Sequence, residues 1–153
     1  MRGFPALLLT GSLLAAADGP PASPGPKDKC PVCGMFVAKF PEWIAVVRFQ
    51  DGSQAFFDGA KDLFAYLQEP RRYRSSSTPK DVASVWVKDY YRQQMIDARR
   101  ACFVLGSNIL GPMGKELVPC ATEAEARTFL KDHAGTRILR FPEVTPEILK
   151  ALQ

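Results

Sequence analysis

The chain has 153 residues, of which 46% are hydrophobic, and a formal net charge of +4 at pH 7. This length suits one domain or two small ones, and the apolar fraction is sufficient for a folded core. The small positive excess argues against a nucleic-acid-binding surface, which needs more charge and interleaved aromatic residues, so we expect no nucleic-acid partner.

The N-terminal residues 1–17 are typical of a secretory signal peptide. Arg2 supplies a positive charge, residues 6–14 are mostly apolar, and three alanines at 15–17 suit a cleavage site. The apolar run is shorter than the about 20 residues that span a bilayer, so we expect no transmembrane segment in the mature chain. Because no lipobox cysteine lies near the cleavage site, the sequence predicts an exported, periplasmic and soluble protein. A buried N-terminal helix is the alternative, and Pro5 disfavours it.

The first structured unit is expected over residues 30–67, after a flexible linker at residues 18–29 that is rich in proline, glycine and charge. Strands are predicted at residues 43–49 and 54–57, because both segments contain β-branched or aromatic residues. Between them, Asp51-Gly52 is a strong signal for a two-residue hairpin turn.

A short helix is predicted to follow the second strand. Asp58 can cap its N-terminus, its apolar residues recur on one face as far as about Leu67, and Pro70 ends it. The polar residues 68–80 are then expected to be a linker to a second unit over residues 81–153.

The second unit is predicted to contain several strand segments and two helices. The strand segments are expected at residues 82–88, 95–97, 101–105 and 137–141, with a loop at residues 106–114. Thr122 and Glu125 form a capping box for a helix to about Lys131, and Gly135 can close its C-terminus. Pro146 favours the start of a short terminal helix. We therefore predict an α+β fold of two related small ββαβ-type units with antiparallel sheets.

The most informative segment is Cys30-Pro31-Val32-Cys33-Gly34-Met35. It brings two thiols and a thioether close together, and soft sulfur ligands favour soft metals, Cu(I) above all. Cys33 and Met35 would lie on the same side of an extended segment, and Gly34 relieves crowding where the backbone folds around an ion. The candidate for a further ligand is Met113, which Pro and Gly flank in a loop.

Other interpretations of Cys30 and Cys33 remain open. A zinc-stabilised interaction module would use them as half a site, but a second pair of ligands at suitable spacing is missing. A thiol–disulfide oxidoreductase would also use them, although no helix start follows. A local disulfide or an inert turn is the third alternative. Cys102 and Cys120 are expected to be buried core thiols, with a disulfide between them as the alternative, and Met95 is expected to be a core residue.

Several motifs follow one another in a particular order and spacing. These are Cys33-Gly34-Met35, Phe57-Asp58-Gly59, Ile96-Asp97-Ala98-Arg99, Gly111-Pro112-Met113-Gly114-Lys115-Glu116 and the segment from Val118 to Glu125. Taken together, these motifs resemble the NosL family, accessory proteins of nitrous-oxide reductase maturation that handle copper outside the cytoplasm. The resemblance extends from about Cys30 to Phe141.

The resemblance implies a two-part fold and a Cu(I) site whose ligands are Cys33, Met35 and Met113. Cys30 departs from the family pattern and adds a second thiol, which is expected to be an extra ligand or a redox partner. It also implies a copper metallochaperone, not an enzyme. Such a protein would deliver Cu(I) to nitrous-oxide reductase or another copper enzyme, and it would work with an ABC-type maturation complex.

Overall fold

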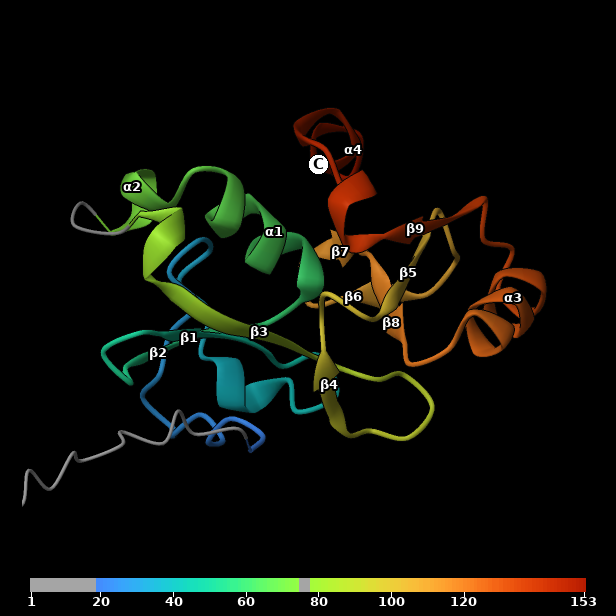
Figure 1. Cartoon of the computed structure of the whole chain (residues 1–153). Helices are drawn as coiled ribbons and strands as arrows, with labels where there is room; N and C mark the ends of the chain where they lie inside the picture. Colours follow the sequence, from blue (N-terminus) through green and yellow to red (C-terminus); the bar gives the residue numbers. More distant parts are fainter. Residues whose placement is uncertain (1–18, 75–77) are drawn as a thin grey trace, which may run out of the picture.

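The computed structural model describes residues 19–74 and 78–153, so the predicted signal peptide at residues 1–17 lies outside the described residues. The chain folds into short helices and antiparallel strands (Figure 1). The α-helices are α1 (Ala60–Gln68), α2 (Pro70–Tyr73), α3 (Glu123–Asp132) and α4 (Pro146–Ala151), and the 3-10 helices are η1 (Val37–Lys39), η2 (Pro79–Asp81) and η3 (Phe141–Glu143). The strands are β1 (Ala45–Phe49), β2 (Gln54–Phe57), β3 (Val82–Lys88), β4 (Met95–Asp97), β5 (Cys102–Leu105), β6 (Leu110–Gly111), β7 (Gly114–Lys115), β8 (Val118–Cys120) and β9 (Arg137–Arg140).

The predicted α+β class with antiparallel sheets is confirmed. Within the described part of the chain, none of the helices combines the length and apolar character that crossing a lipid bilayer requires.

The first sheet has the strand order β2-β1-β3-β4. Its β1–β2 hairpin has a three-residue loop, Gln50 to Gly52, where the sequence predicted a two-residue turn. The Phe49 N–H donates to the Ser53 carbonyl at 2.9 Å, next to the paired residues Arg48 and Gln54. Gly52 has φ 82°, a conformation that glycine adopts without steric cost, which explains why Asp-Gly is found here.

Strands from both predicted units form this first sheet. β3 and β4 follow residues 68–80 in the chain, yet β3 pairs with β1 along its length. Alternate residues of β3, Val85 and Val87, are buried, as expected for a strand that covers the core with one face. The strand pairing therefore does not follow the boundary predicted at residues 68–80, and α2 forms within that segment.

The second sheet has the order β8-β5-β9 and packs against α3. Cys102 and Cys120 lie directly opposite each other on β5 and β8, and both are buried and free. The prediction of buried core thiols is thus confirmed. The capping box is also confirmed, because the Glu125 N–H donates to Thr122 Oγ1 at 3.2 Å and the Glu125 carboxylate accepts from Thr122.

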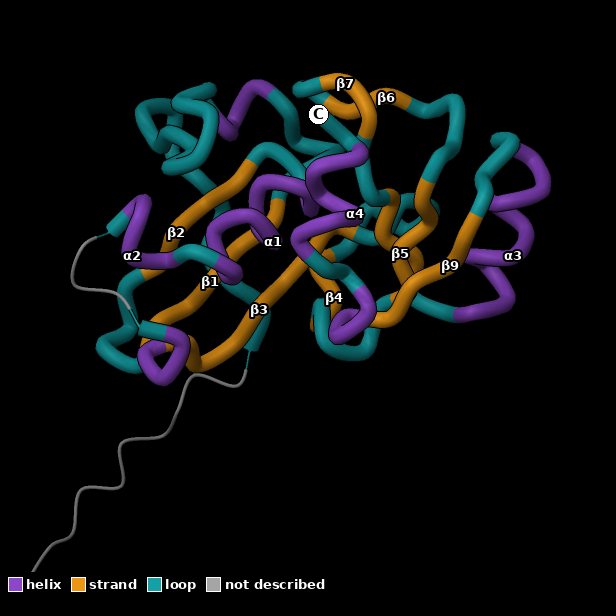
Figure 2. Tube along the Cα trace, turned by 90° about the horizontal axis from the view of Figure 1, so that it is seen from above, coloured by secondary structure: helices purple, strands orange, loops and turns teal. Residues whose placement is uncertain are grey.

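Helix α1 connects the two sheets. It lies over one face of the first sheet, next to α4, while the second sheet lies to its side (Figures 1 and 2). The Phe64 ring lies 5.0 Å from the Phe103 ring on β5 and 5.0 Å from the Phe141 ring, measured between centroids. Apolar residues of both sheets therefore share the main hydrophobic core.

The predicted loop at residues 106–114 contains the start of a small hairpin. Leu110 pairs with Lys115 and Gly111 with Gly114, so Pro112 and Met113 form the turn between β6 and β7. Met113 is 48% exposed on this turn.

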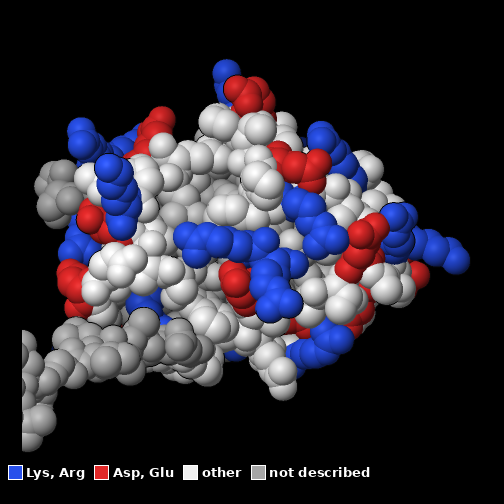
Figure 3. Space-filling model, viewed as in Figure 1, with Lys and Arg blue, Asp and Glu red and all other residues white. Residues whose placement is uncertain are grey.

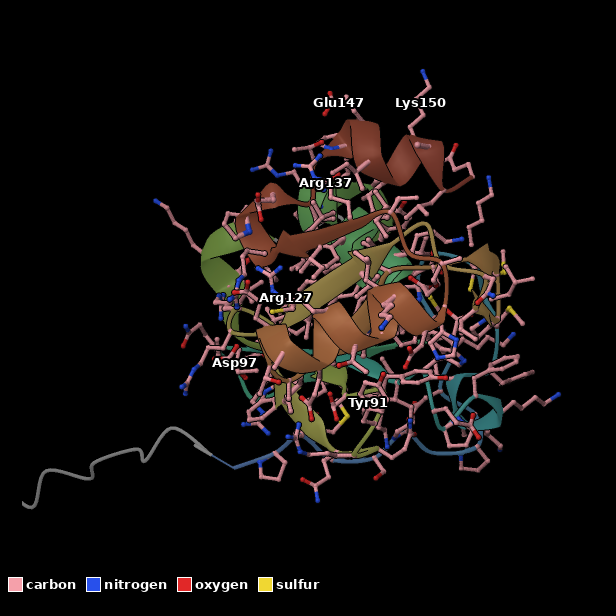
Figure 4. All side chains as sticks on the ribbon, turned by 90° about the vertical axis from the view of Figure 1, so that its right-hand side faces the viewer. Tyr91, Asp97, Arg127, Arg137, Glu147 and Lys150 are labelled. Carbon is pink, nitrogen blue, oxygen red and sulfur yellow. The ribbon has the colours of Figure 1, made fainter. Side chains whose placement is uncertain are left out.

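Acidic and basic side chains are interspersed over the face shown in Figure 3. Several form exposed ion pairs, such as Arg92 with Glu125 at 2.7 Å and Arg140 with Glu123 at 3.1 Å. Arg127 on α3 and Lys150 on α4 project into solvent (Figure 4). Exposed pairs of this kind contribute about 0–1 kcal/mol each, so packing accounts for most of the stability of this face.

Candidate metal centre

Residues 30–35 form a tight turn. The Cys30 N–H donates to the Met35 carbonyl at 2.8 Å, and the Gly34 N–H donates to the Cys30 carbonyl at 2.8 Å. Gly34 has φ 80°, which a side chain would disfavour. The segment is thus folded back on itself and not extended, so the argument that places Cys33 and Met35 on one side of an extended segment does not apply.

Each thiol of this turn is hydrogen-bonded to a carboxylate. Cys33 Sγ lies 3.2 Å from Asp58 Oδ1, and Cys30 Sγ lies 3.3 Å from Asp62 Oδ2. One ligand atom from each of these four residues can be chosen so that all lie within 4.8 Å of one another. We call Cys30, Cys33, Asp58 and Asp62 the thiol–carboxylate cluster.

The sequence analysis did not identify Asp58 and Asp62 as site residues. Asp58 was predicted to cap α1, but Gly59 is the N-cap residue and no side chain caps the helix from that position. Asp58 instead turns toward Cys33. Asp62 follows four residues later, in the first turn of α1. Residues four positions apart lie on the same side of a helix, so this spacing brings the Asp58 and Asp62 side chains together at the N-terminus of α1. That spacing was the available signal.

The N-terminus of α1 is capped by a side chain from the segment between β7 and β8. Glu116 follows β7, and its Oε1 atom accepts from the backbone N–H of Lys61 at 2.6 Å and from that of Leu117 at 2.8 Å. Lys61 Nζ in turn donates to the carbonyls of Met113 and Lys115, both at 3.0 Å. The hairpin that carries Met113 is thereby attached to the helical turn that contains Asp62.

Burial shapes the electrostatics of the cluster. Burial, with the hydrogen bond to Asp58 acting in the same direction, raises the pKa of Cys33 to about 12. Burial likewise raises the pKa of Cys30, with the negative charge of Asp62 adding to the effect. The pKa of the Asp62 carboxyl is raised by burial as well. The thiols and carboxyls of the cluster, all of which are anionic when deprotonated, therefore lie close together in a site with little solvent. A bound cation would compensate their negative charge.

This arrangement bears on which chemistry the cysteines can support. Redox-active cysteines have lowered pKa values, because the thiolate is the reactive form. Here the pKa of Cys33 and that of Cys30 are raised, which disfavours thiol–disulfide exchange. Thiolates suit Cu(I), and a set of two thiolates and two carboxylates is also acceptable to Zn²⁺.

The predicted ligands are distributed over two segments, each of which contacts the first turn of α1. Cys30, Cys33 and Met35 lie in one turn, and Met113 lies on the β6–β7 hairpin that Lys61 contacts. Met95 lies on β4 and packs against the main core, as predicted.

Comparisons with known proteins identify similar chains. The NosL family model matches residues 21–149. The copper-binding lipoprotein NosL of Stutzerimonas stutzeri is 33% identical over 125 residues, which cover 80% of this chain and 65% of that relative. The chain therefore spans less than two thirds of the length of this curated relative.

Two solved structures share the fold. The crystal structure of the copper chaperone NosL from Shewanella denitrificans has a TM-score of 0.72 and 26% identity, and the match covers 84% of this chain and 97% of that chain. The solution structure of apo-NosL from Achromobacter cycloclastes has a TM-score of 0.50 and 23% identity, with 69% of this chain and 87% of that chain covered, and it supports the fold alone.

Proposed function

The chain belongs to the NosL family, and on that premise we propose that it is an exported copper metallochaperone that holds and releases Cu(I) and is not an enzyme. The observation that carries this proposal is the thiol–carboxylate cluster, whose ligand atoms lie within 4.8 Å of one another. Similar proteins named as a copper-binding lipoprotein and a copper chaperone support copper as the cargo.

In this proposal Cys33 binds Cu(I) as a thiolate, while Met35 and Met113 supply thioethers. Cu(I) accepts few ligands and prefers sulfur, so these three side chains are sufficient. Thioethers carry no charge and do not titrate, which leaves the ion exchangeable and confines the pH dependence to the cysteines. Cys30 is either a fourth ligand or a redox partner of Cys33; in the second case an external two-electron oxidant would convert the two cysteines to a disulfide and release the ion.

Asp58 has a defined part in this chemistry. It accepts the hydrogen bond of the Cys33 thiol, so it is the nearest acceptor when that thiol loses its proton to bind the ion. Once that proton has passed on to solvent, the Asp58 carboxylate remains beside the site and adds negative charge that favours a cation.

The receiving protein is proposed to be nitrous-oxide reductase or another copper enzyme, reached in cooperation with an ABC-type maturation complex in the periplasm. This part of the proposal rests on the family resemblance, since the family takes part in maturing that reductase. The mature chain is proposed to act as a soluble protein.

The test is an anaerobic competition titration of the reduced protein against a coloured Cu(I) chelator. We expect one tightly bound Cu(I), which Met113→Ala weakens. Met95→Ala is the matched control, because Met95 packs against the core instead of lying on the hairpin. A protein that cannot compete with the chelator would contradict the copper proposal.

A zinc-stabilised interaction module is the second candidate, favoured by Asp58 and Asp62, whose oxygen atoms are harder ligands than sulfur. In that case removal of zinc with a chelator would unfold the protein, whereas a copper carrier stays folded without its cargo. Far-ultraviolet circular dichroism before and after chelation separates the two.

A further inference from the structure

Lys61 connects the two segments that carry the proposed ligands. It belongs to the first turn of α1, next to Asp62, whose carboxylate contacts Cys30. Its Nζ atom donates to the carbonyls of Met113 and Lys115, at 3.0 Å in both cases. One side chain therefore contacts both the turn and the second strand of the β6–β7 hairpin.

Glu116 also connects the β6–β7 hairpin to α1. In this case the side chain comes from the hairpin segment and contacts the backbone of α1. Glu116 is 4% exposed, and its carboxylate caps the α1 backbone through the Lys61 N–H at 2.6 Å. The space for it comes from two glycines. A Cβ atom on Gly59 would lie 2.1 Å from Glu116 Oε2, and one on Gly111 would lie 3.0 Å from Glu116 Cγ.

We propose that Lys61 and Glu116 are positioning residues for the metal site. Together they hold the β6–β7 hairpin, and with it Met113, against the first turn of α1, which carries Asp62 of the thiol–carboxylate cluster. This inference rests on the proposed function, because it concerns the thioether that completes the Cu(I) site. Met113 lies in the two-residue turn between β6 and β7, and both contacts attach this hairpin to α1.

Whether Lys61 acts by positioning Met113 or by its charge can be decided from the direction in which its replacement changes the Cu(I) affinity. The Lys61 ammonium repels a cation, so if its charge were its main influence, replacing it by a neutral residue would strengthen Cu(I) binding. Loss of positioning has the opposite result. Outer groups that orient metal ligands are worth about 10- to 100-fold in affinity, and we expect Lys61→Met to weaken Cu(I) binding about 10-fold.

The experiment compares Cu(I) competition titrations of wild type, Lys61→Met and Lys115→Met. Lys115→Met is the matched control, since it removes the same charge from an exposed position of the hairpin and keeps the backbone carbonyl that Lys61 contacts. It should leave the affinity at the wild-type level. In a Met113→Ala background, Lys61→Met should cause no further loss, because the two residues act through the same ligand.

Hydrogen exchange gives a readout that does not depend on the ion, and the Glu116 variants give a further binding test. Amide hydrogen exchange of residues 110–117 should become faster in metal-free Lys61→Met, with the α3 amides unchanged. Glu116→Ala should weaken Cu(I) binding, and Glu116→Gln, which keeps an acceptor oxygen for the Lys61 N–H, should restore most of it.

The possible failures are distinguishable. If the wild-type protein does not bind Cu(I), the proposed function and this inference both fail. If wild type binds Cu(I) in a Met113-dependent way, but Lys61→Met binds equally or more tightly and its hairpin exchanges no faster, the positioning role alone is overturned.

Discussion

The thiol of Cys33 lies 3.2 Å from one carboxylate oxygen of Asp58 and 3.4 Å from the other, although the two residues are 25 positions apart in the chain. Burial and this contact keep the pKa of Cys33 at about 12 and therefore hold the thiol protonated at neutral pH. A metal ion that binds the thiolate must displace that proton, and this makes the site testable.

The first prediction concerns pH. Because the proton is bound below the Cys33 pKa of about 12, the apparent affinity for Cu(I) should rise with pH between about pH 6 and about pH 9, by about tenfold per pH unit for each thiol that binds. Competition titrations at several pH values measure the slope. A flat profile would show that no protonated thiol is displaced.

The two cysteines should not contribute equally. Cys33→Ser should abolish tight Cu(I) binding, because it removes the one thiolate of the proposed set, whereas Cys30→Ser should only weaken it. The same chelator competition measures both, with thermal unfolding of the metal-free variants as the control for folding. Equal losses would favour a site built from two thiolates.

Gly59 is needed for space at the start of α1. Its φ is 175°, which any residue adopts, but an added Cβ would lie 2.1 Å from Glu116 Oε2. Glu116 is buried and holds two backbone hydrogen bonds, so it cannot move aside freely. We expect Gly59→Ala to lower the free energy of unfolding by about 1–3 kcal/mol, measured by urea denaturation.

Gly19→Ala is the matched control for that substitution, since a Cβ there meets nothing within 4 Å. It should leave the free energy of unfolding unchanged. If Gly59→Ala were equally harmless, the close packing of Glu116 against α1 would not matter for stability.

Phe64 should make the two sheets unfold together. It is 3% exposed and lies between Phe103 of the second sheet and Phe141. Phe64→Ala should cost about 3–5 kcal/mol through the lost burial and the cavity left behind. Phe36→Ala, at a ring that is 36% exposed, is the control and should cost much less. Separate unfolding transitions in the wild-type protein would contradict a shared core.

Local features were predictable because they depend on neighbouring residues. The strand at residues 54–57 has the predicted bounds, and Thr122 and Glu125 form the predicted capping box. In both cases the deciding features are short-range: aromatic residues next to a hairpin turn, or hydrogen bonds between residues three positions apart. The sulfur-containing turn was recognisable for the same reason.

The first sheet was harder to predict. β3 and β4 follow the segment that was expected to separate two units, and yet they pair with β1 and with each other. A β-branched run indicates a strand but says nothing about its partner, because pairing depends on which apolar faces share a core. The prediction therefore located the strands without assigning them to the correct sheet.

The sequence by itself determined the secondary structure of most segments, the sulfur chemistry of Cys30 and Cys33, and the resemblance to a copper-handling family. Only the tertiary structure decided that Asp58 and Asp62 face those thiols and that Glu116 caps α1. These contacts join residues 25, 32 and 55 positions apart. Over such distances the packing of α1 between two sheets, and not the preference of any local segment, determines which polar groups meet.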